Sequence, residues 1–269
     1  MRADLVPDDL WERVAPLLLP APERRHRYPG RLRVADRAAL AGILYVLRTG
    51  VAWRDVPAET VGCSGVTAWR RLRDWTEAGV WPRLPAALLS ELRRNDLLDL
   101  DDCAVDGSHV RALKRGDHVG PSPVDRARPG SKHHVIVDRH GTPLAVTLTG
   151  GNRHDITQLL PLLDAVPPIR GLRGRPRRKP RRLYADRGND FDKYRRLLWK
   201  RGVKPLIARR GVAHGSGLGR VRWVVERAFA WLHQFKRLRI RYERRADLHQ
   251  GLLELACGLI CLRRLRTSF

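Results

Sequence analysis

The spacing of apolar residues changes near residue 100, and this change constrains the fold more than any other feature of the sequence. Before that point, apolar residues recur every three or four positions, as they do along one face of a helix. Three stretches show the pattern: residues 7–19, 35–50 and 63–81. Asp36 and Gly50 are expected to begin and end the second helix, and Ser64 or Thr67 to cap the third. The first part of the chain is therefore predicted to be helical.

After residue 100 the sequence alternates between short β-rich runs and helical stretches. The first run ends at Asp106, and residues 132–150 have the pattern of a hairpin whose turn contains Gly141, which can adopt a positive φ. Next come a helix beginning at Asp155, a strand ending at Asp186, a helix, a strand, a long helix over about 219–238, and a final apolar helix. The order predicts an α/β fold, a mixed sheet flanked by helices in which an edge hairpin precedes βαβ units.

The formal net charge of +25 and the isoelectric point near 11.4 imply a polyanionic partner. Without one, the mutual repulsion of so many like charges would be an uncompensated cost. Nucleic acid is the leading candidate, and an anionic membrane surface is the second. Membrane residence is not expected, because the longest apolar runs are shorter than the roughly 20 residues that span a bilayer. The N-terminus lacks the apolar core of a signal peptide, so a cytoplasmic protein is expected.

Two groups of arginines are candidates for contact with a nucleic acid. In residues 170–182, eight of thirteen side chains are Arg or Lys and none is acidic, so this segment is expected to be an exposed loop. It either binds DNA, through residues such as Arg175, Arg177 and Arg178, or is simply solvated. The helix expected near residue 70 carries Arg70, Arg71 and Arg73 away from its apolar face. It resembles the recognition helix of a helix-turn-helix, although an ordinary amphipathic helix would look the same.

Three carboxylates have positions that suggest a metal site. Asp106 and Asp186 end strands, and the ends of neighbouring strands in an open α/β sheet converge. Glu226 is on the long helix and shares a face with Arg222 and His233, separate from the apolar face. Phosphodiester chemistry is served by two Mg²⁺ or Mn²⁺ ions, which prefer carboxylate ligands. The alternative is that these acids are counterions to the many basic residues, or turn-capping residues.

The segments around these acids resemble the DDE transposases of bacterial insertion sequences, specifically the insertion-sequence-five family. The similarity is carried in order by "GILYVLRTGVAWRDVP" with "WRRLRDWTEAGVW", "AVDGSHVRA", "TGGNRHDITQLLPLLDAV", "LYADRGND" and "RWVVERAFAWLHQFKRLRIRYE". It extends from about residue 5 to 264. Each motif alone is modest, but the five in order form a specific match.

This resemblance implies an RNase H-like catalytic domain with Asp106, Asp186 and Glu226 as its DDE triad. The helix signature of the wider group is Tyr-x2-Arg-x3-Glu-x6-Lys. Arg222 and Glu226 match it, whereas Gly219 and His233 replace the Tyr and the Lys. Arg222, His233 and Lys236 are accordingly expected to contact DNA, although the two departures leave open which side chain contacts its terminus. No mechanism follows for Asn152 or His154 of the "GNRHD" stretch, in which His154 and Asp155 are interpreted as a helix start.

The expected protein is thus a transposase with a helical DNA-binding domain over residues 1–97 and an RNase H-like catalytic domain over 98–269. It would use Mg²⁺ or Mn²⁺, as two ions, to cleave double-stranded DNA at terminal inverted repeats and join the 3′-OH to target DNA. A homodimer or larger oligomer is expected, because two DNA ends must be held together. The alternatives are a structure-selective nuclease such as a junction resolvase, and a non-enzymatic DNA-binding relic.

Overall fold

The computed structural model describes residues 5–21, 23, 27, 32–211 and 219–267, and in the described part of the first 95 residues the regular elements are helices, as predicted. The helices of this part are α1 (Asp8–Val14), α2 (Asp36–Thr49), α3 (Ala58–Val61), α4 (Gly65–Glu77) and α5 (Val80–Arg94), with short 3-10 turns η1 (Ala15–Leu17) and η2 (Trp53–Asp55). Gly50 ends α2 in the left-handed conformation at φ 75°, and the Ser64 hydroxyl accepts from the Thr67 N–H to cap α4, both as expected. The expected cap at Asp36 is wrong, because Ala35 is the N-cap and Asp36 is already helical.

The second part is built around a mixed sheet. Its strands are β1 (Asp102–Ala112), β2 (Gly120–Pro121), β3 (Pro129–Val137), β4 (Pro143–Gly150), β5 (Arg182–Ala185), β6 (Lys204–Ile207) and β7 (Ile240–Arg241). The order runs β2-β3-β1-β5-β6, with β4 also pairing with β3 and β7 with β1. β3 is antiparallel to both β1 and β4, and β1, β5 and β6 are parallel. The predicted hairpin is present, and Gly141 turns it at φ 80°.

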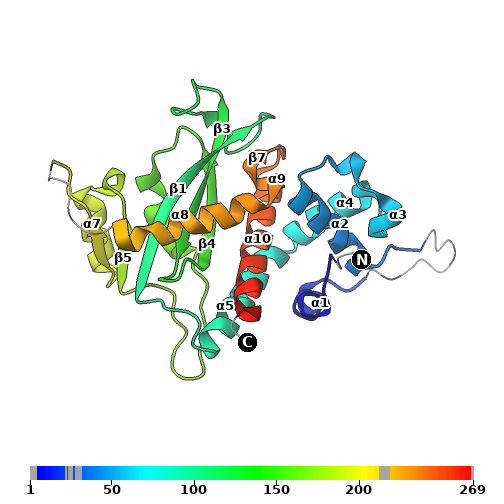
Figure 1. The fold of residues 1–269 in the computed structure, drawn as a ribbon, viewed down its shortest axis with the longest axis horizontal. Helices are drawn as coiled ribbons and strands as arrows, with labels where there is room; N and C mark the ends of the chain where they lie inside the picture. The colour runs from blue at the N-terminus through cyan, green and yellow to red at the C-terminus, as the bar shows by residue number, and fades with distance from the viewer. Residues whose placement is uncertain (1–4, 22, 24–26, 28–31, 212–218, 268–269) are drawn as a thin grey trace.

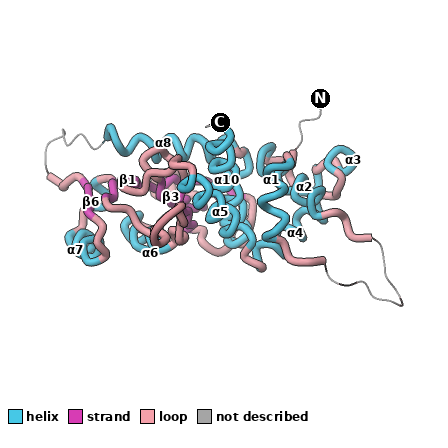
Figure 2. Tube along the Cα trace, turned by 90° about the horizontal axis from the view of Figure 1, so that it is seen from below, coloured by secondary structure: helices cyan, strands magenta, loops and turns pink. Residues whose placement is uncertain are grey.

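Helices cover both faces of this sheet. They are α6 (Leu159–Asp164), α7 (Asp192–Lys200), α8 (Gly219–Gln234), α9 (Lys236–Arg239) and α10 (Ala246–Arg266), with 3-10 turns η3 (Asp155–Gln158) and η4 (Arg187–Asn189). Seen along the sheet, α8 lies on one side and α6 and α7 lie on the other (Figure 2). No helix in these described ranges combines the length and hydropathy needed to cross a bilayer.

The expected end of the long helix is wrong. The long helix ends at Gln234 rather than near Leu238, because Phe235 leaves the helical conformation. The residues beyond it form α9 and then β7, a strand parallel to the far end of β1 that the sequence did not suggest. The helical segment expected to begin at Asp155 does begin there, with His154 as its N-cap, although its first turn is a 3-10 turn. The sequence also predicts a glycine-rich turn at "AHGSGLG", residues 213–219. Only Gly219 of this turn is among the described residues.

Helix α10 joins the two parts of the molecule (Figure 1). It runs between the sheet and the N-terminal helices and packs against both α5 and β4. Two glycines allow the close approach of α10 to α5: a Cβ on Gly251 would lie 2.6 Å from the Trp81 ring, and one on Gly258 would lie 2.9 Å from Leu84. The helical and sheet-based parts therefore share one hydrophobic core.

A buried polar network reinforces this junction. The Arg237 guanidinium donates two hydrogen bonds to Glu243 Oε1, at 2.9 and 2.6 Å. The second oxygen of Glu243 lies 3.4 Å from His249 Nδ1, and His249 Nε2 lies 2.9 Å from His133 Nε2 on β3. Burial acts to raise the pKa of Glu243, but the hydrogen bond from His249 and the charge of Arg237 outweigh it and lower that pKa to about 2. The pair therefore stabilises the fold at neutral pH, and this contribution is lost only as the pH falls below about 4.5 towards 2.

Arg237 also reaches the N-terminal helices. Its guanidinium donates to the Val51 carbonyl at 3.1 Å and stacks on the Trp53 ring at 5.7 Å and the Tyr242 ring at 4.5 Å. Both members of the Arg237–Glu243 pair are less than 7% exposed. One guanidinium therefore connects the end of α2, the α9–β7 segment and, through Glu243, the start of α10.

Replacing Arg237 is expected to destabilise the whole fold. Arg237→Met leaves the buried Glu243 charge without its partner, so the free energy of unfolding should fall by about 3–5 kcal/mol. Arg239→Met, two residues away and exposed, should change it by no more than about 0.5 kcal/mol. Urea denaturation at pH 7 of the three proteins measures both values. Equal stabilities would contradict the role assigned to Arg237.

Candidate active site

Asp106 lies within β1, and Asp186 directly follows β5, the neighbouring parallel strand. The prediction that the first strand ends at Asp106 is wrong, because the pairing of β1 with β3 extends to Arg111. The register of β1 and β5 pairs Asp102 with Arg182 and Ala104 with Tyr184. Continuing that register by two residues brings Asp106 level with Asp186. Because side chains alternate between the faces of a sheet, both carboxylates project on the same side as Asp102 and Arg182. The two aspartates thus lie at one level of the sheet, one within β1 and the other directly after β5.

The charges on this face differ between the two ends of the strand pair. Asp102 accepts two hydrogen bonds from Arg182, one at 2.7 Å, so this pair is complementary. Four residues later the two opposed side chains are both acids. Burial raises the pKa of Asp106, against hydrogen bonding by the Gly107 N–H and the charge of Arg222, and Asp186 and Asp155 raise it further. Like charges at opposed positions are destabilising unless a cation lies between or beside them.

A guanidinium from α8 provides part of that compensation. Arg222 donates to Asp106 Oδ2 at 2.9 Å, and α8 packs across β1. The Nε of Arg222 is buried and has no hydrogen-bond partner among the described residues. Arg222 therefore holds Asp106 as a counterion while part of its own hydrogen-bonding capacity is unused.

Asp186 is held by the turn that follows it. Its side chain accepts from the Asn189 amide, and Asp186 is the N-cap residue of η4. A Cβ on Gly188 would lie 3.1 and 3.2 Å from the two carboxylate oxygens of Asp186, which is closer than nine in ten of the contacts that Cβ atoms make in proteins. The glycine in "DRGN" therefore leaves room for the carboxylate.

Glu226 is not assembled with the other two acids. It is exposed on α8, one helical turn after Arg222. Within the residues that the structure describes, no three His, Cys, Asp or Glu side chains are grouped closely enough to hold a metal ion. The structure therefore brings together two of the three predicted carboxylates and leaves the third nearby on the same helix as Arg222.

Asp155 lies beside Asp106, although the sequence suggested only a helix start. Its Oδ1 is 3.0 Å from Lys132 Nζ and 3.6 Å from His134 Nδ1, both on β3. The same oxygen would be 2.7 Å from a Cβ on Gly107, the residue after Asp106. A small cavity is lined by Asp106, His134, Asp155 and residues of α6 and η4. The only sequence signal for this neighbour was the "GNRHD" motif itself.

His154 connects the same motif to the Asp186 turn. Its ring makes an edge-to-face contact with Phe191, with centroids 5.7 Å apart. Phe191 directly precedes α7 and follows η4. His154 thus contacts the residue that follows the Asp186 turn, and Asp155 lies beside Asp106.

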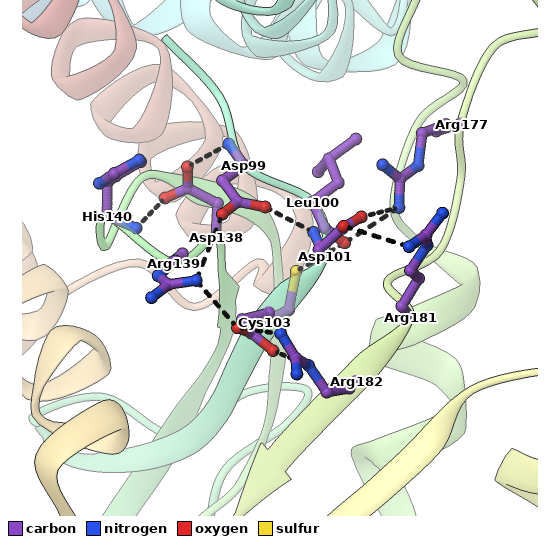
Figure 3. Close-up of polar contacts among 11 residues, drawn as sticks. Asp99, Leu100, Asp101, Cys103, Asp138, Arg139, His140, Arg177, Arg181 and Arg182 are labelled. Atoms are coloured by element: carbon purple, nitrogen blue, oxygen red, sulfur yellow. Dashed lines mark hydrogen bonds and ion pairs between the residues drawn. The ribbon is translucent and has the colours of Figure 1, made fainter. Parts of the chain in front are cut away.

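Much of the basic segment over 170–182 is neutralised within the molecule. Arg177 donates to Asp101 at 2.8 Å, Arg181 lies 3.7 Å from the same carboxylate, and Arg182 pairs with Asp102 (Figure 3). Arg175 and Arg178 are more available: Arg178 is exposed, and neither has an ion-pair partner among the described residues. Residues 170–181 lie outside the helices and named strands, as expected, whereas Arg182 is the first residue of β5, and Arg177 has a structural role that the sequence did not suggest.

The arginines of α4 are divided in a similar way. Arg71 is paired with Asp36 at 3.0 Å and is largely covered. Arg73 is paired with Asp74 at 2.7 Å. Arg70 is exposed and lines a hollow with Arg33 and Thr67. Of the three, Arg70 therefore has the charge most available to a phosphate.

The two basic residues expected near the end of α8 also differ. Burial, with the charge of Arg239, lowers the pKa of His233 and so favours its neutral form. The His233 Nε2 atom is buried and lacks a hydrogen-bond partner among the described residues. Lys236 is exposed at the first position of α9. The neutral form of His233 offers no positive charge at the position where the wider group's signature has a lysine.

Comparison with known proteins places these motifs in families. Residues 98–261, more than half of the chain, match the family model described as "Transposase DDE domain". Residues 6–85 match one described as "Putative transposase of IS4/5 family (DUF4096)".

Two relatives come from the same insertion element of Burkholderia cepacia. The "Putative transposase for insertion sequence element IS402" is 64% identical over 150 residues, which cover 56% of this chain and 71% of that protein. The "Insertion element IS402 uncharacterized 16.2 kDa protein" is 53% identical over 124 residues, covering 46% of this chain and 84% of that protein. Among solved structures, a pre-cleavage Mos1 transpososome is similar over 97% of this chain and 86% of that one, at 13% identity and a TM-score of 0.27. This structural similarity is distant and gives no residue correspondence.

Removing one of the opposed charges is expected to stabilise the protein in the absence of divalent metal. Asp106→Asn relieves the repulsion from Asp186, so the free energy of unfolding at pH 7 in EDTA should rise by up to about 1 kcal/mol. Asp102→Asn, on the same strand and face, breaks a complementary pair and should lower it by about 1–3 kcal/mol.

Added Mg²⁺ gives a second measurement by thermal denaturation. It should raise the melting temperature of the wild type, because a ligand that binds only the folded state stabilises that state. It should have little effect on Asp106→Asn. An Asp106→Asn variant that is less stable than the wild type in EDTA would contradict the opposed-charge interpretation.

Proposed function

The chain belongs to the transposase DDE-domain family, and from this premise we propose that Asp106, Asp186 and Glu226 are its catalytic carboxylates. As a DDE transposase the protein is an enzyme that cleaves and joins DNA with the help of divalent metal. The observation that supports this assignment best is the placement of Asp106 and Asp186 at one register of two parallel strands. Two opposed acids in a chain of net charge +25 form a site suited to cations.

The residues present fit Mg²⁺ or Mn²⁺. Asp106 and Asp186 offer carboxylate oxygens, which these hard cations prefer, and Glu226 would add a third group from α8. When bound, two such ions would polarise the scissile phosphate and help to activate the attacking oxygen. Because Glu226 is exposed and not grouped with the other acids, its side chain or α8 has to shift for all three to act together.

Arg222 is positioned to change partner when DNA binds. In the structure its guanidinium neutralises Asp106, and its Nε has unused hydrogen-bonding capacity. A phosphate at the site would be a bidentate acceptor for the same guanidinium. Arg222 would thus hold the carboxylate in the free protein and orient the scissile phosphate in the complex. Asp155 and Lys132 would keep the opposite side of Asp106 fixed.

DNA binding follows from the charge distribution. Arg70, Arg175, Arg178 and Lys236 have cationic groups that no described residue neutralises, and such groups bind phosphates independently of sequence. We propose that α4 contacts the terminal inverted repeats and that the exposed part of the basic segment contacts the backbone or a minor groove. The two ends would be held together by a homodimer or a larger oligomer, and the protein would act on target DNA in the cytoplasm, at the nucleoid.

Two other functions make different predictions. A structure-selective nuclease on the same fold would prefer branched DNA to inverted-repeat ends. A relic that only binds DNA would cleave nothing with any metal, and EDTA would not change its binding. The placement of Asp106 opposite Asp186 favours an active enzyme over such a relic.

The proposal is tested by Mg²⁺-dependent nicking of a duplex that carries the inverted repeat of the element. Asp106→Asn, Asp186→Asn and Glu226→Gln should each reduce the nicking rate by about 10³-fold or more, since an oxygen ligand is replaced by a weaker one. Asp164→Asn, an exposed acid of α6 paired with Arg201, is the matched control and should leave the rate unchanged. DNA affinity in Ca²⁺ should remain within about threefold of the wild type in all four variants. Undiminished nicking by Asp186→Asn would refute the triad.

A further inference from the structure

A second cavity lies away from the carboxylates, at the junction of the N-terminal helices with the β7–α10 segment. Its volume is about 550 Å³. Three aromatic residues line it: Trp53 of η2, Trp69 of α4 and Tyr242 after β7. Five basic residues line it as well: Arg54, Lys114, Arg237, Arg244 and Arg245. The function proposed above assigns no role to this cavity.

Two arginines of the protein stack on these rings, and one of them, Arg237, also lines the cavity. The Arg237 guanidinium stacks on Trp53 and on Tyr242, and the Arg73 guanidinium lies 5.8 Å from the centre of the Trp69 ring. All three aromatic residues are half-buried and contribute to the cavity wall. The rings are therefore fixed before any ligand arrives, and cation–π stacking uses only part of their surface.

The wall is strongly positive. The acidic residue that lines it, Glu243, is buried and paired with Arg237. Lys114 and Arg244 are exposed and have no ion-pair partner among the described residues. The cavity thus combines aromatic rings with available cationic groups, and its ligand should have a flat π face and a negative charge.

The walls are also preformed by a close backbone contact. A Cβ on Gly116 would lie 2.1 Å from the Arg244 carbonyl oxygen, so only a glycine fits there. The Arg241 guanidinium donates to the carbonyls of His118 and Arg244, at 3.0 Å in both cases. The loop carrying Lys114 is therefore fixed against the segment carrying Tyr242 and Arg244.

A nucleotide with an unpaired base is the ligand that this chemistry fits. Bases inside a duplex are stacked on one another, and a protein that contacts only the backbone needs no aromatic rings. An unpaired base exposes its face to an aromatic side chain, and its phosphate lies within reach of Lys and Arg. The volume is ample for one base with its sugar and leaves no room for the width of a duplex.

We propose that this cavity binds one unpaired nucleotide of the DNA whose phosphate is at the carboxylate site. This inference rests on the proposed function, since DNA is the ligand of both sites. β7 pairs with β1 at Arg111 and Ala112, five and six residues beyond Asp106. That separation is about 20 Å at ~3.3 Å per residue, or about six nucleotides at ~3.4 Å each. The unpaired nucleotide is thus expected about six positions from the nicked phosphate.

The first experiment uses the unmodified full-length protein and photo-crosslinking. Duplexes carry one unpaired 5-iodouracil, which is moved one position at a time along each strand from the nicked phosphate. Crosslinking to Trp53, Trp69 or Tyr242, mapped by mass spectrometry and confined to one or two positions, supports the proposal. Efficient DNA binding without a crosslink to any of the three rings, at every position, overturns it.

The second experiment compares binding to two DNAs in Ca²⁺, one fully paired and one with a single unpaired nucleotide at the crosslinked position. Tyr242→Leu removes the ring but keeps an apolar side chain, so affinity for the unpaired DNA should fall about tenfold while affinity for paired DNA is unchanged. Tyr242→Phe should bind as the wild type does. Trp199→Leu, on α7 and 56% exposed but outside the cavity, controls for the loss of a surface aromatic residue.

The outcomes separate this inference from the proposed function. Equal weakening on both DNAs by Tyr242→Leu would mean that the cavity contacts only backbone, and would overturn the inference. Circular dichroism checks that this variant folds, and if it does not, the crosslinking of the wild type decides. Mg²⁺-dependent nicking of fully paired DNA by the wild type tests the carboxylates alone. It can succeed while the inference fails.

Discussion

The buried pair between Arg237 and Glu243 is the contact on which the arrangement of the two parts depends. A buried ion pair is stabilising only if its remaining hydrogen-bonding groups are also satisfied, because desolvation costs several kcal/mol per charge. Here the guanidinium also reaches the Val51 carbonyl, and the second carboxylate oxygen faces His249. Apolar packing between α10 and α5 would tolerate small shifts, whereas this network has one geometry. We infer that the pair fixes how the helical part sits on the sheet.

Where Asp106 of β1 lies level with Asp186, charges of the same sign are opposed instead of paired. Asp102 and Asp106 are on one strand and one face, four residues apart. The first is matched by Arg182, and the second is level with Asp186. In a chain with 53 basic and 28 acidic residues, a partner for each acid is easy to supply. A pair of opposed acids, one of which has Arg222 as its counterion, is therefore a local departure from the general pattern, and such departures occur where function requires them.

Local rules predicted the elements whose cause is local. Gly50 and Gly141 adopt a positive φ at the turns expected of them, and the Ser64 cap forms. Asp106 and Asp186 lie level because β1 and β5 are parallel neighbours, although β1 continues beyond Asp106 to Ala112. β7 was missed because it has two residues, and only its pairing with β1 makes it a strand. The break after Gln234 was missed for a similar reason: Phe235 continues the apolar spacing of α8, while the chain turns to place Arg237 beside Glu243.

The candidate site shows the same limit. Helical spacing correctly put Glu226 and Arg222 on one side of the long helix. It did not show which of the two would contact Asp106, and in the structure the Arg222 guanidinium makes this contact. Composition left the basic segment as either a DNA-binding or a solvated loop, and neither alternative includes the contacts of Arg177, Arg181 and Arg182 with Asp101 and Asp102, which depend on the sheet register. Asp155 has the spacing of a helix start, and its carboxylate nevertheless faces Lys132 of a neighbouring strand. Pairings between residues distant in sequence thus decide which charges are available to DNA. Charge counts along the chain overestimate the binding surface wherever an acid from another strand lies opposite.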